Sequence, residues 1–317
     1  MILVTGATGL VGNAIAARLA GRGDAVRALV RDVARAKALV PSGVELVNGD
    51  LDDPASLADA MRGVDLVFHA AGMPEQWQPD ESVFDRVNRL GTKNVAEAAL
   101  AARVGRVVYT STMDVFAAPR GGTLVEDNVD PDPKPTAYER SKQAAERAIE
   151  AVAREGLEVV YVNPAAVYGP SPVVTGLNVF LQKLLRGEVP MLPPGGMPVA
   201  FVDGVADAHV AAAERGAAGA RYLVADEHAS TKRLAEMLLE GTGRRAPRVA
   251  PAPLVRALAA VSAPVARWVG AKPLVAPGEL SFVLWDVRVD ASKAKRELGF
   301  EPTPLARGLA AARAALS

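Results

Sequence analysis

The sequence contains no cysteine and only three histidines among its 317 residues. Without cysteine the chain can form no disulfide, no zinc–thiolate site and no thiol nucleophile. The histidines, His69, His209 and His228, do not stand at ligand spacing from one another or from an acidic cluster. We therefore assign them structural roles and expect no metal. The nucleophile motif of serine hydrolases and the His-Glu-x-x-His motif of zinc peptidases are also missing, so hydrolase chemistry has no support.

Net charge is missing as well, since 36 basic side chains balance 36 acidic ones. A neutral chain lacks the broad positive surface that attracts nucleic acid or anionic membrane, so we expect neither as a partner. The N-terminus shows no targeting segment. The most apolar later stretch, residues 257–266, is shorter than the roughly 20 residues that cross a bilayer, and we expect a buried or half-buried helix there. The missing targeting segment predicts a cytoplasmic protein.

Half of the residues are apolar, and in the first half of the chain short β-branched runs alternate with alanine-rich stretches. This alternation is typical of βαβ units in a parallel sheet that is covered on both faces. Connections of this kind are nearly always right-handed, so we predict an α/β fold with a doubly wound parallel sheet. The predicted strands are residues 1–4, 25–30, 44–47, 65–69, 106–110, 158–163 and 221–225. The predicted helices are residues 12–20, 82–102 and 137–155.

Residues 164–198 differ from the first half, because they hold seven prolines and only three charged side chains. A chain of this length allows two domains. We therefore predict that residues 1–170 and 199–229 form a Rossmann domain around the parallel sheet. The remaining residues, 171–198 and 230–317, are expected to form a smaller, discontinuous substrate-binding lobe over the carboxyl edge of the sheet.

A glycine-rich turn follows the first predicted strand and opens the first helix. In dinucleotide-binding folds such glycines allow a tight turn, close approach of a pyrophosphate to the backbone, and close packing of helix on strand. The start of the helix adds unpaired N–H groups and a partial positive charge. The residues predicted to bind the phosphates are Gly6, Thr8, Gly9, Leu10, Val11 and Gly12.

The end of the second predicted strand distinguishes the two nicotinamide dinucleotides. An acidic residue there binds the adenosine ribose of NAD, whereas an arginine binds the 2′-phosphate of NADP. Val30 stands at the usual acidic position and Arg31 follows, with Arg35 and Lys37 one turn later, so we favour NADP over NAD. Asp32 argues against this preference for NADP, because its carboxylate could bind a ribose itself; it could also cap the next helix.

Tyr138 and Lys142 are four residues apart, so both project from one face of the helix predicted over residues 137–155. Ser111 and Thr112 follow a predicted strand and bring hydroxyls to the same carboxyl edge. A phenol has a pKa of about 10, and a nearby cation favours the phenolate. We therefore expect Lys142 to lower the pKa of Tyr138 while Thr112 or Ser111 holds a substrate oxygen. This arrangement suits hydride transfer coupled to proton transfer at a carbinol or carbonyl.

Further motifs along nearly the whole chain resemble the extended short-chain dehydrogenases/reductases, the NAD-dependent epimerase/dehydratase family. Besides the glycine turn and the Tyr138/Lys142 pair, these motifs are Gly49-Asp50-Leu51, His69-Ala70-Ala71-Gly72, Val87-Asn88-x-x-Gly91-Thr92, Asn163-Pro164-x-x-x-Tyr168-Gly169-Pro170 and the late pair Asp290-x-x-Lys293 and Leu298-Gly299-Phe300. The run Val-Arg-Ala-Leu-Val-Arg-Asp in the second strand is similar to the dihydroflavonol-reductase-like and hydroxysteroid-dehydrogenase-like branch. The resemblance also implies that two copies could pair as a homodimer through the helices predicted at 82–102 and 137–155.

The resemblance implies a role for each residue that matches a family motif. Tyr138 would be the general acid/base, Lys142 its activator and ribose ligand, and Thr112 the hydroxyl nearest the reacting oxygen, with Ser111 as the substitute. Asn88 would stand in the helix that backs the site. The residues implied to lie along the cofactor are Asp50 and Leu51 beside the adenine, Ala70, Ala71 and Gly72 along the dinucleotide, and Pro164, Ala165 and Val167 near the nicotinamide amide.

Two departures from the family pattern bear on the reaction. Dehydratases of the family carry an Asp-Glu pair directly after the catalytic threonine, whereas this chain has Met113 and Asp114, so dehydration is disfavoured. The usual His-Val-Asp-Asp-Val-Ala segment has Gly204 in place of its second aspartate. The contact that this aspartate makes in relatives is therefore not expected here.

We therefore predict an NADPH-dependent oxidoreductase that reduces a ketone or aldehyde on an apolar substrate, with Tyr138 as proton donor. The alternative enzyme is a nucleotide-sugar epimerase with tightly bound NAD. It needs basic residues for the substrate pyrophosphate, and the candidates are Arg186, Arg221 and Arg288. A third hypothesis is a redox sensor that binds NADP and a partner protein, but such proteins commonly lack the tyrosine/lysine pair.

Overall fold

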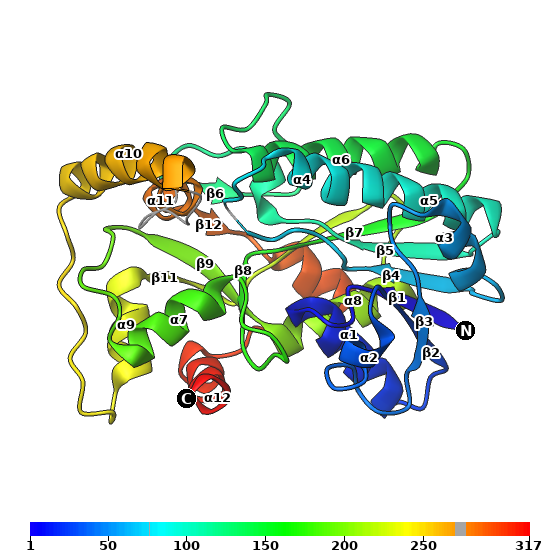
Figure 1. Cartoon of the computed structure of the whole chain (residues 1–317), viewed down its shortest axis with the longest axis horizontal. Helices are drawn as coiled ribbons and strands as arrows, with labels where there is room; N and C mark the ends of the chain where they lie inside the picture. Colours follow the sequence, from blue (N-terminus) through cyan, green and yellow to red (C-terminus); the bar gives the residue numbers. More distant parts are fainter. Residues whose placement is uncertain (76, 270–276) are drawn as a thin grey trace.

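A central sheet of seven parallel strands organises the protein (Figure 1). The computed structural model describes residues 1–75, 77–269 and 277–317. The order of the strands across the sheet is β10-β7-β5-β4-β1-β2-β3. Their bounds are β1 (Ile2–Thr5), β2 (Val26–Val30), β3 (Glu45–Asn48), β4 (Leu66–His69), β5 (Arg106–Thr110), β7 (Val159–Pro164) and β10 (Arg221–Val224). The predicted α/β class and doubly wound sheet are confirmed, and each predicted strand lies within one residue of the observed bounds.

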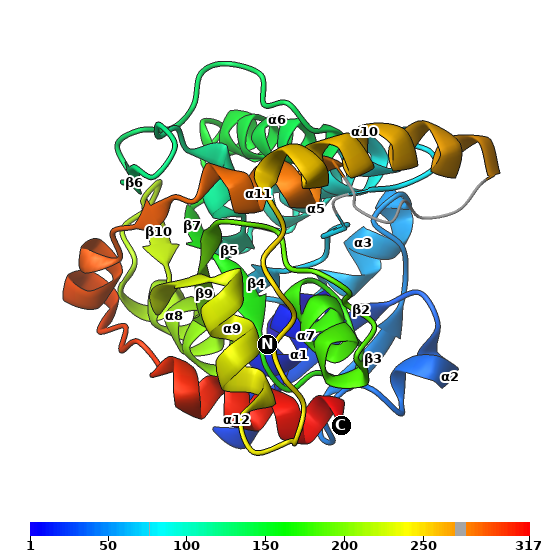
Figure 2. The same ribbon diagram turned by 90° about the vertical axis from the view of Figure 1, so that its left-hand side faces the viewer.

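Helices cover both faces of the sheet, as Figures 1 and 2 show. One face carries α3 (Pro54–Ala60), α5 (Gly91–Ala101) and α6 (Ala137–Ala153), and the other carries α1 (Leu10–Gly21), α2 (Val33–Ala36) and α8 (Val202–Arg215). Successive strand residues therefore enter two different apolar cores: Val67 belongs to the core beneath α3, α5 and α6, and Phe68 to the core that contains α1 and α8. Burial on both faces explains the apolar runs in the central strands β1, β4, β5 and β7, whereas the edge strand β3 has no buried residue.

The helix predicted over residues 82–102 is continuous but irregular. It begins with the short α4 (Ser82–Phe84), passes through a π-helical segment at Asp85–Leu90 and continues as α5. π-Helical turns add one residue to a helix and often mark functional sites. The helix predicted over 137–155 is observed as α6, two residues shorter at its end. Pairing of two protein copies through these helices stays a prediction.

The remaining elements gather at one end of the sheet. A small sheet has the order β11-β9-β8, with β8 (Ala166–Tyr168), β9 (Gly196–Phe201) and β11 (Glu227–Ser230), and β6 (Thr123–Leu124) pairs with β12 (Arg288–Val289). The helices α7 (Leu177–Arg186), α9 (Thr231–Leu239) and α12 (Leu305–Leu316) contact one another beside that sheet. The sequence patterns predicted none of these five short strands.

Residues 257–266 lie within α10 (Ala252–Val269), which crosses the outside of the molecule next to α11 (Pro277–Trp285) (Figures 1 and 2). Val255 and Ala259 pack against α11, whereas Val261 is 67% exposed. Among its described side chains, residues 257–262, Ala259 is buried, Ser262 is intermediate and the other four are exposed, so this part of the helix is less buried than expected. Within the described part of the chain, no helix combines the length and the apolar character needed to cross a membrane.

Candidate active site

The glycine-rich turn after β1 is so tightly packed that side chains at Gly6 and Gly12 would collide with the backbone. Gly6 has a φ of +77°, and a Cβ on Gly12 would lie 2.3 Å from the carbonyl oxygen of Gly6. α1 begins directly after Gly9, with no side-chain cap and no acidic residue in its first turn. The first N–H groups of a helix lack intrahelical partners. The start of α1 therefore offers free N–H groups and a partial positive charge next to a turn without side chains. These features suit the binding of a pyrophosphate.

Asn88 holds the segment that follows β4. Its Oδ1 accepts from the N–H of Met73 at 2.7 Å, and its Nδ2 donates to the Met73 carbonyl at 3.3 Å. The same Nδ2 lies 2.8 Å from the Ser141 hydroxyl on α6. Asn88 is 1% exposed and sits in the π-helical segment. It thus joins α6 to the residues Ala70, Ala71 and Gly72, which lie at the edge of the sheet where the dinucleotide is predicted.

The end of β2 presents two arginines without ion pairs among the described residues. Arg31 follows β2 and Arg35 lies in α2, and both are exposed. Asp32 accepts from the N–H of Arg35 at 2.9 Å and caps α2. Of the two roles that the sequence left open for Asp32, helix capping is the one observed. At the end of β3, Asp50 accepts from the Asp52 N–H at 3.1 Å, and the carbonyl of Leu51 accepts from Asn94 at 2.8 Å.

Tyr138 lies in the first turn of α6, whose start is fixed by a capping box between Thr136 and Glu139. The phenol lies near the hydroxyl of Thr112, which follows β5. Burial raises the pKa of the Tyr138 phenol, the nearby Asp114 raises it further, and the contact with Thr112 lowers it. Tyr138 and Thr112 are therefore brought together at the carboxyl edge of the sheet.

Lys142 is 6% exposed and points at β5 rather than at Tyr138. Its Nζ donates to the hydroxyl of Tyr109 and to the carbonyl of Thr110, each at 2.9 Å. Burial lowers the pKa of Lys142 to about 8. We expected its ammonium group to depress the pKa of Tyr138. That pKa is raised instead, because burial is the largest influence and the ammonium bonds to Tyr109.

One side chain from each of five neighbouring strands forms a row across the sheet: Thr5, His69, Tyr109, Tyr161 and Arg221. Thr5 Oγ1 lies 2.7 Å from His69 Nδ1, and the His69 ring stacks on Tyr109 with centroids 5.5 Å apart. Tyr109 and Tyr161 meet edge to face at 6.2 Å, and Arg221 lies 4.8 Å above Tyr161. Burial lowers the pKa of His69 to about 3, so this histidine is neutral.

Glu146 links α6 to the far end of that row. Its Oε2 accepts from Arg221 at 2.9 Å and its Oε1 accepts from Asn163 at 2.9 Å. Asn163 also donates to the carbonyl of Thr112 at 3.1 Å. The side chains of Lys142 and Glu146, four residues apart on α6, therefore both bind this row. Sequence reasoning missed Tyr109 and Glu146, and the only signal for Glu146 was its position one helical turn beyond Lys142.

Asp114 is the third residue that sequence reasoning did not place in the site. It lies in the 3₁₀ turn Met113–Val115 directly after Thr112, and it is 3% exposed. Thr112 Oγ1 donates to Asp114 Oδ2 at 2.9 Å. Burial raises the pKa of Asp114 to about 7, and the charge of Glu139 adds to this effect. In the sequence, the only indication of this role was that Asp114 stands between the apolar residues Met113 and Val115.

The other predicted residues line the end of β5 and β7. Ser111 is buried beside Thr112, and its hydroxyl has no hydrogen-bond partner among the described residues. Pro164 ends β7, the N–H of Ala165 donates to the Val224 carbonyl at 2.9 Å, and Val167 lies in β8. All three therefore follow the strand next to β5.

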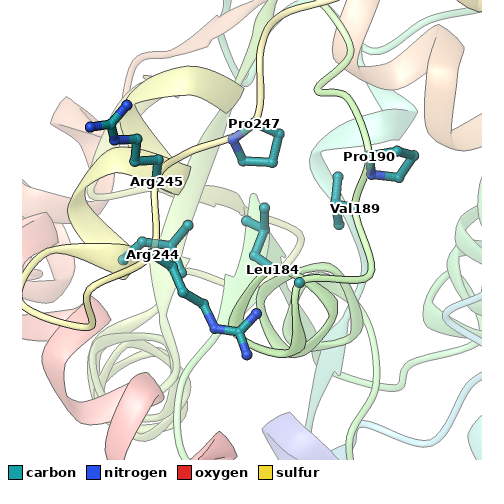
Figure 3. A pocket seen from close by; sticks show the side chains of 8 residues that line it. Leu184, Val189, Pro190, Arg244, Arg245 and Pro247 are labelled. Atoms are coloured by element: carbon teal, nitrogen blue, oxygen red, sulfur yellow. The ribbon is translucent and has the colours of Figure 1, made fainter.

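A hollow of about 370 Å³ lies away from these residues, between α7 and the loop after α9 (Figure 3). Leu184, Val189 and Pro247 are among its lining residues, and Arg244 points towards the end of α7 at Gly187. A cation at a helix C-terminus complements the helix dipole. Neither Tyr138 nor the glycine turn lines this hollow. Elsewhere in the described residues, no three acidic or histidine side chains gather in a way that could hold a metal ion.

The comparisons with known proteins agree with this geometry. The sequence model of the NAD dependent epimerase/dehydratase family matches residues 2–225. Sterol demethylase protein B of Methylococcus capsulatus is 33% identical over 95% of this chain and 93% of that protein. A 4-hydroxy-2-methyl-3-oxo-4-farnesyl-3,4-dihydroquinoline-1-oxide ketoreductase of Stigmatella aurantiaca is 30% identical over 94% of this chain and 90% of that protein.

A solved structure, MoeE5 in complex with UDP-glucose and NAD, is similar with a TM-score of 0.77 and 27% identity, covering 99% of this chain and 97% of that one. The family match spans the strands and loops that carry the glycine turn, Thr112, Tyr138 and Lys142. The chain therefore belongs to the NAD-dependent epimerase/dehydratase family, and it is an NAD(P)-dependent enzyme of the extended short-chain dehydrogenase/reductase type.

Proposed function

We propose that this protein is an NADPH-dependent reductase of a ketone or aldehyde on an apolar small molecule, with Tyr138 as proton donor. The proposal rests mainly on the position of the Tyr138 phenol near the Thr112 hydroxyl, since Tyr138 begins α6 and Thr112 follows β5 at the carboxyl edge of the sheet. Two hydroxyl groups at this position can bind one carbonyl oxygen, and only a phenol that keeps its proton can donate it. The raised pKa of Tyr138 supports this direction of transfer.

The residues present fit a bound dinucleotide with an additional phosphate. The backbone at Gly9 and the start of α1 would bind the pyrophosphate, and Arg31 and Arg35 would bind the 2′-phosphate. Asp32 is engaged as a helix cap, which reduces its availability as a ribose ligand. When bound, the cofactor supplies a hydride at its nicotinamide ring.

Lys142 has a separate task in this scheme. An ammonium group has three donors, and two of them bind Tyr109 and the Thr110 carbonyl. The third is left for a ribose hydroxyl, the role that family resemblance implies. The two fixed hydrogen bonds orient the amine, and its charge favours the anion that develops when Tyr138 gives up its proton.

The surroundings of the site support an apolar substrate. β9 is buried from Gly196 to Phe201 and carries no charged side chain, and it pairs with β8 directly after the residues Pro164 and Ala165. The ketoreductase relative is named for a substrate that carries a farnesyl group. Binding of this substrate by residues 171–198 and 230–317, with the dinucleotide bound by the rest of the chain, belongs to the proposal.

A nucleotide-sugar epimerase with tightly bound NAD is the second candidate, because MoeE5 is similar over nearly the whole chain and binds UDP-glucose and NAD. That reaction needs cations for a pyrophosphate. Arg221 is engaged by Glu146 and Tyr161 beneath α6, which leaves Arg186 and Arg288 as candidates. The reduced set of cations favours the reductase.

The first test is thermal shift titration with NADP and NAD in parallel, followed by NADPH oxidation with a panel of carbonyl compounds. We expect NADP to raise the melting temperature more than NAD does at equal concentration. Arg35→Ala should weaken NADPH binding about tenfold and leave NADH binding unchanged, since a charge-assisted hydrogen bond contributes about 1.5 kcal/mol. Arg62→Ala, at an exposed arginine at the opposite edge of the sheet, is the matched control.

The second test is Tyr138→Phe, which should abolish turnover and keep the NADP-dependent rise in melting temperature. Tyr168→Phe is its control, because the Tyr168 hydroxyl is buried without a partner among the described residues. Turnover by Tyr138→Phe would refute the mechanism. Copurified NAD together with a melting temperature raised by a UDP-sugar would replace the reductase with the epimerase.

A further inference from the structure

Thr112 and Asp114 form a closed hydrogen-bonded pair beside Tyr138. Thr112 Oγ1 donates to Asp114 Oδ2 at 2.9 Å and accepts from the Asp114 N–H at 3.3 Å. Asp114 is 3% exposed, and its other oxygen, Oδ1, is buried with no partner among the described residues. An ionised carboxylate in such a place is costly, because one oxygen has lost its water and gained no donor.

Charged groups of both signs face Asp114. Burial has the largest effect on its pKa and raises it to about 7, and the negative charge of Glu139 on α6 acts in the same direction. Lys142 on α6 and Lys134 in the loop before α6 act in the opposite direction, as does the hydrogen bond from Thr112. Asp114 can therefore gain or lose a proton near neutral pH.

The protonation state of Asp114 decides what the Thr112 hydroxyl can do, since a hydroxyl has one donor and two acceptor sites. When Asp114 is ionised, Thr112 donates to it and accepts from its N–H, and the remaining acceptor site takes the proton of the Tyr138 phenol. When Asp114 is neutral, its O–H fills that remaining acceptor site. Thr112 must then donate to the Tyr138 oxygen, and the phenol proton is free to face a substrate carbonyl.

We propose that Asp114 is a positioning residue that sets the direction of the Thr112 hydroxyl, and through it the direction in which Tyr138 offers its proton. The inference rests on the proposed reductase function for its consequence in turnover. In reduction, hydride adds to the carbonyl carbon and the phenol proton to the carbonyl oxygen. The phenolate then accepts a hydrogen bond from Thr112 and regains a proton from water, while Asp114 keeps its own proton throughout.

The pH dependence of carbonyl reduction tests this proposal. In the wild type, kcat should fall about tenfold per pH unit above the titration of Asp114, because a single proton is lost. In Asp114→Asn the amide can donate to Thr112 at every pH, so this fall should disappear while NADPH binding is kept. An alkaline fall that persists in Asp114→Asn at the wild-type midpoint would overturn the proposal. A fall that persists in Asp114→Asn with its midpoint moved to lower pH arises from Lys142, whose pKa drops when the Asp114 charge is gone, and it overturns the proposal as well.

A double-mutant cycle with Thr112→Val distinguishes two ways in which Asp114 could act on Tyr138. One is through the Thr112 hydroxyl, which we call the relay, and the other is the direct electrostatic effect of the Asp114 charge. If Asp114 acts through Thr112, the pH dependence that Asp114→Asn removes is absent in Thr112→Val and returns in Thr112→Ser, which restores a hydroxyl. If the charge acts on Tyr138 directly, Asp114→Asn changes the pH profile equally in both backgrounds, and the relay is refuted.

A spectroscopic measurement keeps the proposal testable if no carbonyl compound is reduced. Infrared difference spectra of wild type against Asp114→Asn isolate the C=O stretch of the neutral Asp114 carboxyl group. The band should titrate near pH 7, and Thr112→Val should shift it because the carboxyl O–H loses its acceptor. Absence of the band below neutral pH, or a band unchanged in Thr112→Val, overturns the inference. Absence of turnover with an intact, Thr112-sensitive band overturns only the reductase.

Discussion

Replacing Arg221 by methionine removes the cation from a buried ion pair and leaves the hydrocarbon part of the side chain largely in place. The side chain of Glu146 is 4% exposed and that of Arg221 is 20% exposed. After the change, Asn163 is the one side chain that still donates to Glu146 in the observed network. The substitution therefore leaves a buried carboxylate without its counter-charge.

The expected loss follows from two contacts. Removing one partner of a buried ion pair costs about 3–5 kcal/mol, and we take about 3 kcal/mol because Arg221 keeps some contact with water. The cation also lies 4.8 Å above the Tyr161 ring, a contact that contributes about 1 kcal/mol. We therefore expect Arg221→Met to lower the free energy of unfolding by about 4 kcal/mol.

Urea unfolding, followed by circular dichroism with and without NADP, measures this loss. The matched control is Lys93→Met, which breaks the exposed pair with Glu97, where the side chains are 44% and 50% exposed. That pair should contribute about 0.5 kcal/mol or less. The double variant Glu146→Gln/Arg221→Met should regain most of the stability, because the glutamine amide oxygen can still accept from Asn163. A loss in Arg221→Met no larger than in Lys93→Met would refute the reasoning.

Three further changes test separate parts of the site. Gly12→Ala should abolish the NADP-dependent rise in melting temperature, because its Cβ would lie 2.3 Å from the Gly6 carbonyl oxygen, whereas Gly21→Ala on the same helix meets nothing within 4 Å and should keep it. The folded-state pKa of Asp114, about 7, lies above the unfolded value of about 4, so stability falls as pH rises through this window. Asp114→Asn should therefore stabilise the protein more at pH 8 than at pH 5, and an equal effect on thermal unfolding at both pH values would contradict the burial of this carboxyl. Asp32→Ala should cost about 1 kcal/mol of stability through loss of the helix cap, and a changed preference between NADP and NAD in titrations would instead make Asp32 a ribose ligand.

The strands of the main sheet were predictable from the sequence because they are buried on both faces. A strand of this kind contains a buried apolar run such as residues 107–109 in β5, which can be recognised from the sequence without knowing its partners. The strands β8, β9 and β11 were missed for the opposite reason. β8 and β11 have three and four residues, β8 and β9 lie in or at the end of the proline-rich stretch, and all three strands are held by pairing with one another.

The candidate site divides in the same way. The glycine turn and the pair Tyr138 and Lys142 have a local spacing that a reader of the sequence can recognise. The partner of Lys142 is Tyr109, which lies 33 residues earlier and reaches it only because β5 passes beneath α6. Asp114 acquires its raised pKa from burial, which is a property of the folded chain and not of the residues beside it.

The π-helical segment before α5 constrains the length of the chain as well as its composition. Its extra residue sets the angle at which the side chain of Asn88 meets Met73 on one side and Ser141 on the other. Each residue of an α-helix turns the chain by about 100°. Deleting one residue from Asp85–Leu90 would let the helix become regular and would rotate Asn88 away from both partners. Within this family, variants that keep the hydrogen bonds of Asn88 to Met73 and Ser141 should therefore differ in the segment Asp85–Leu90 by substitution and not by insertion or deletion.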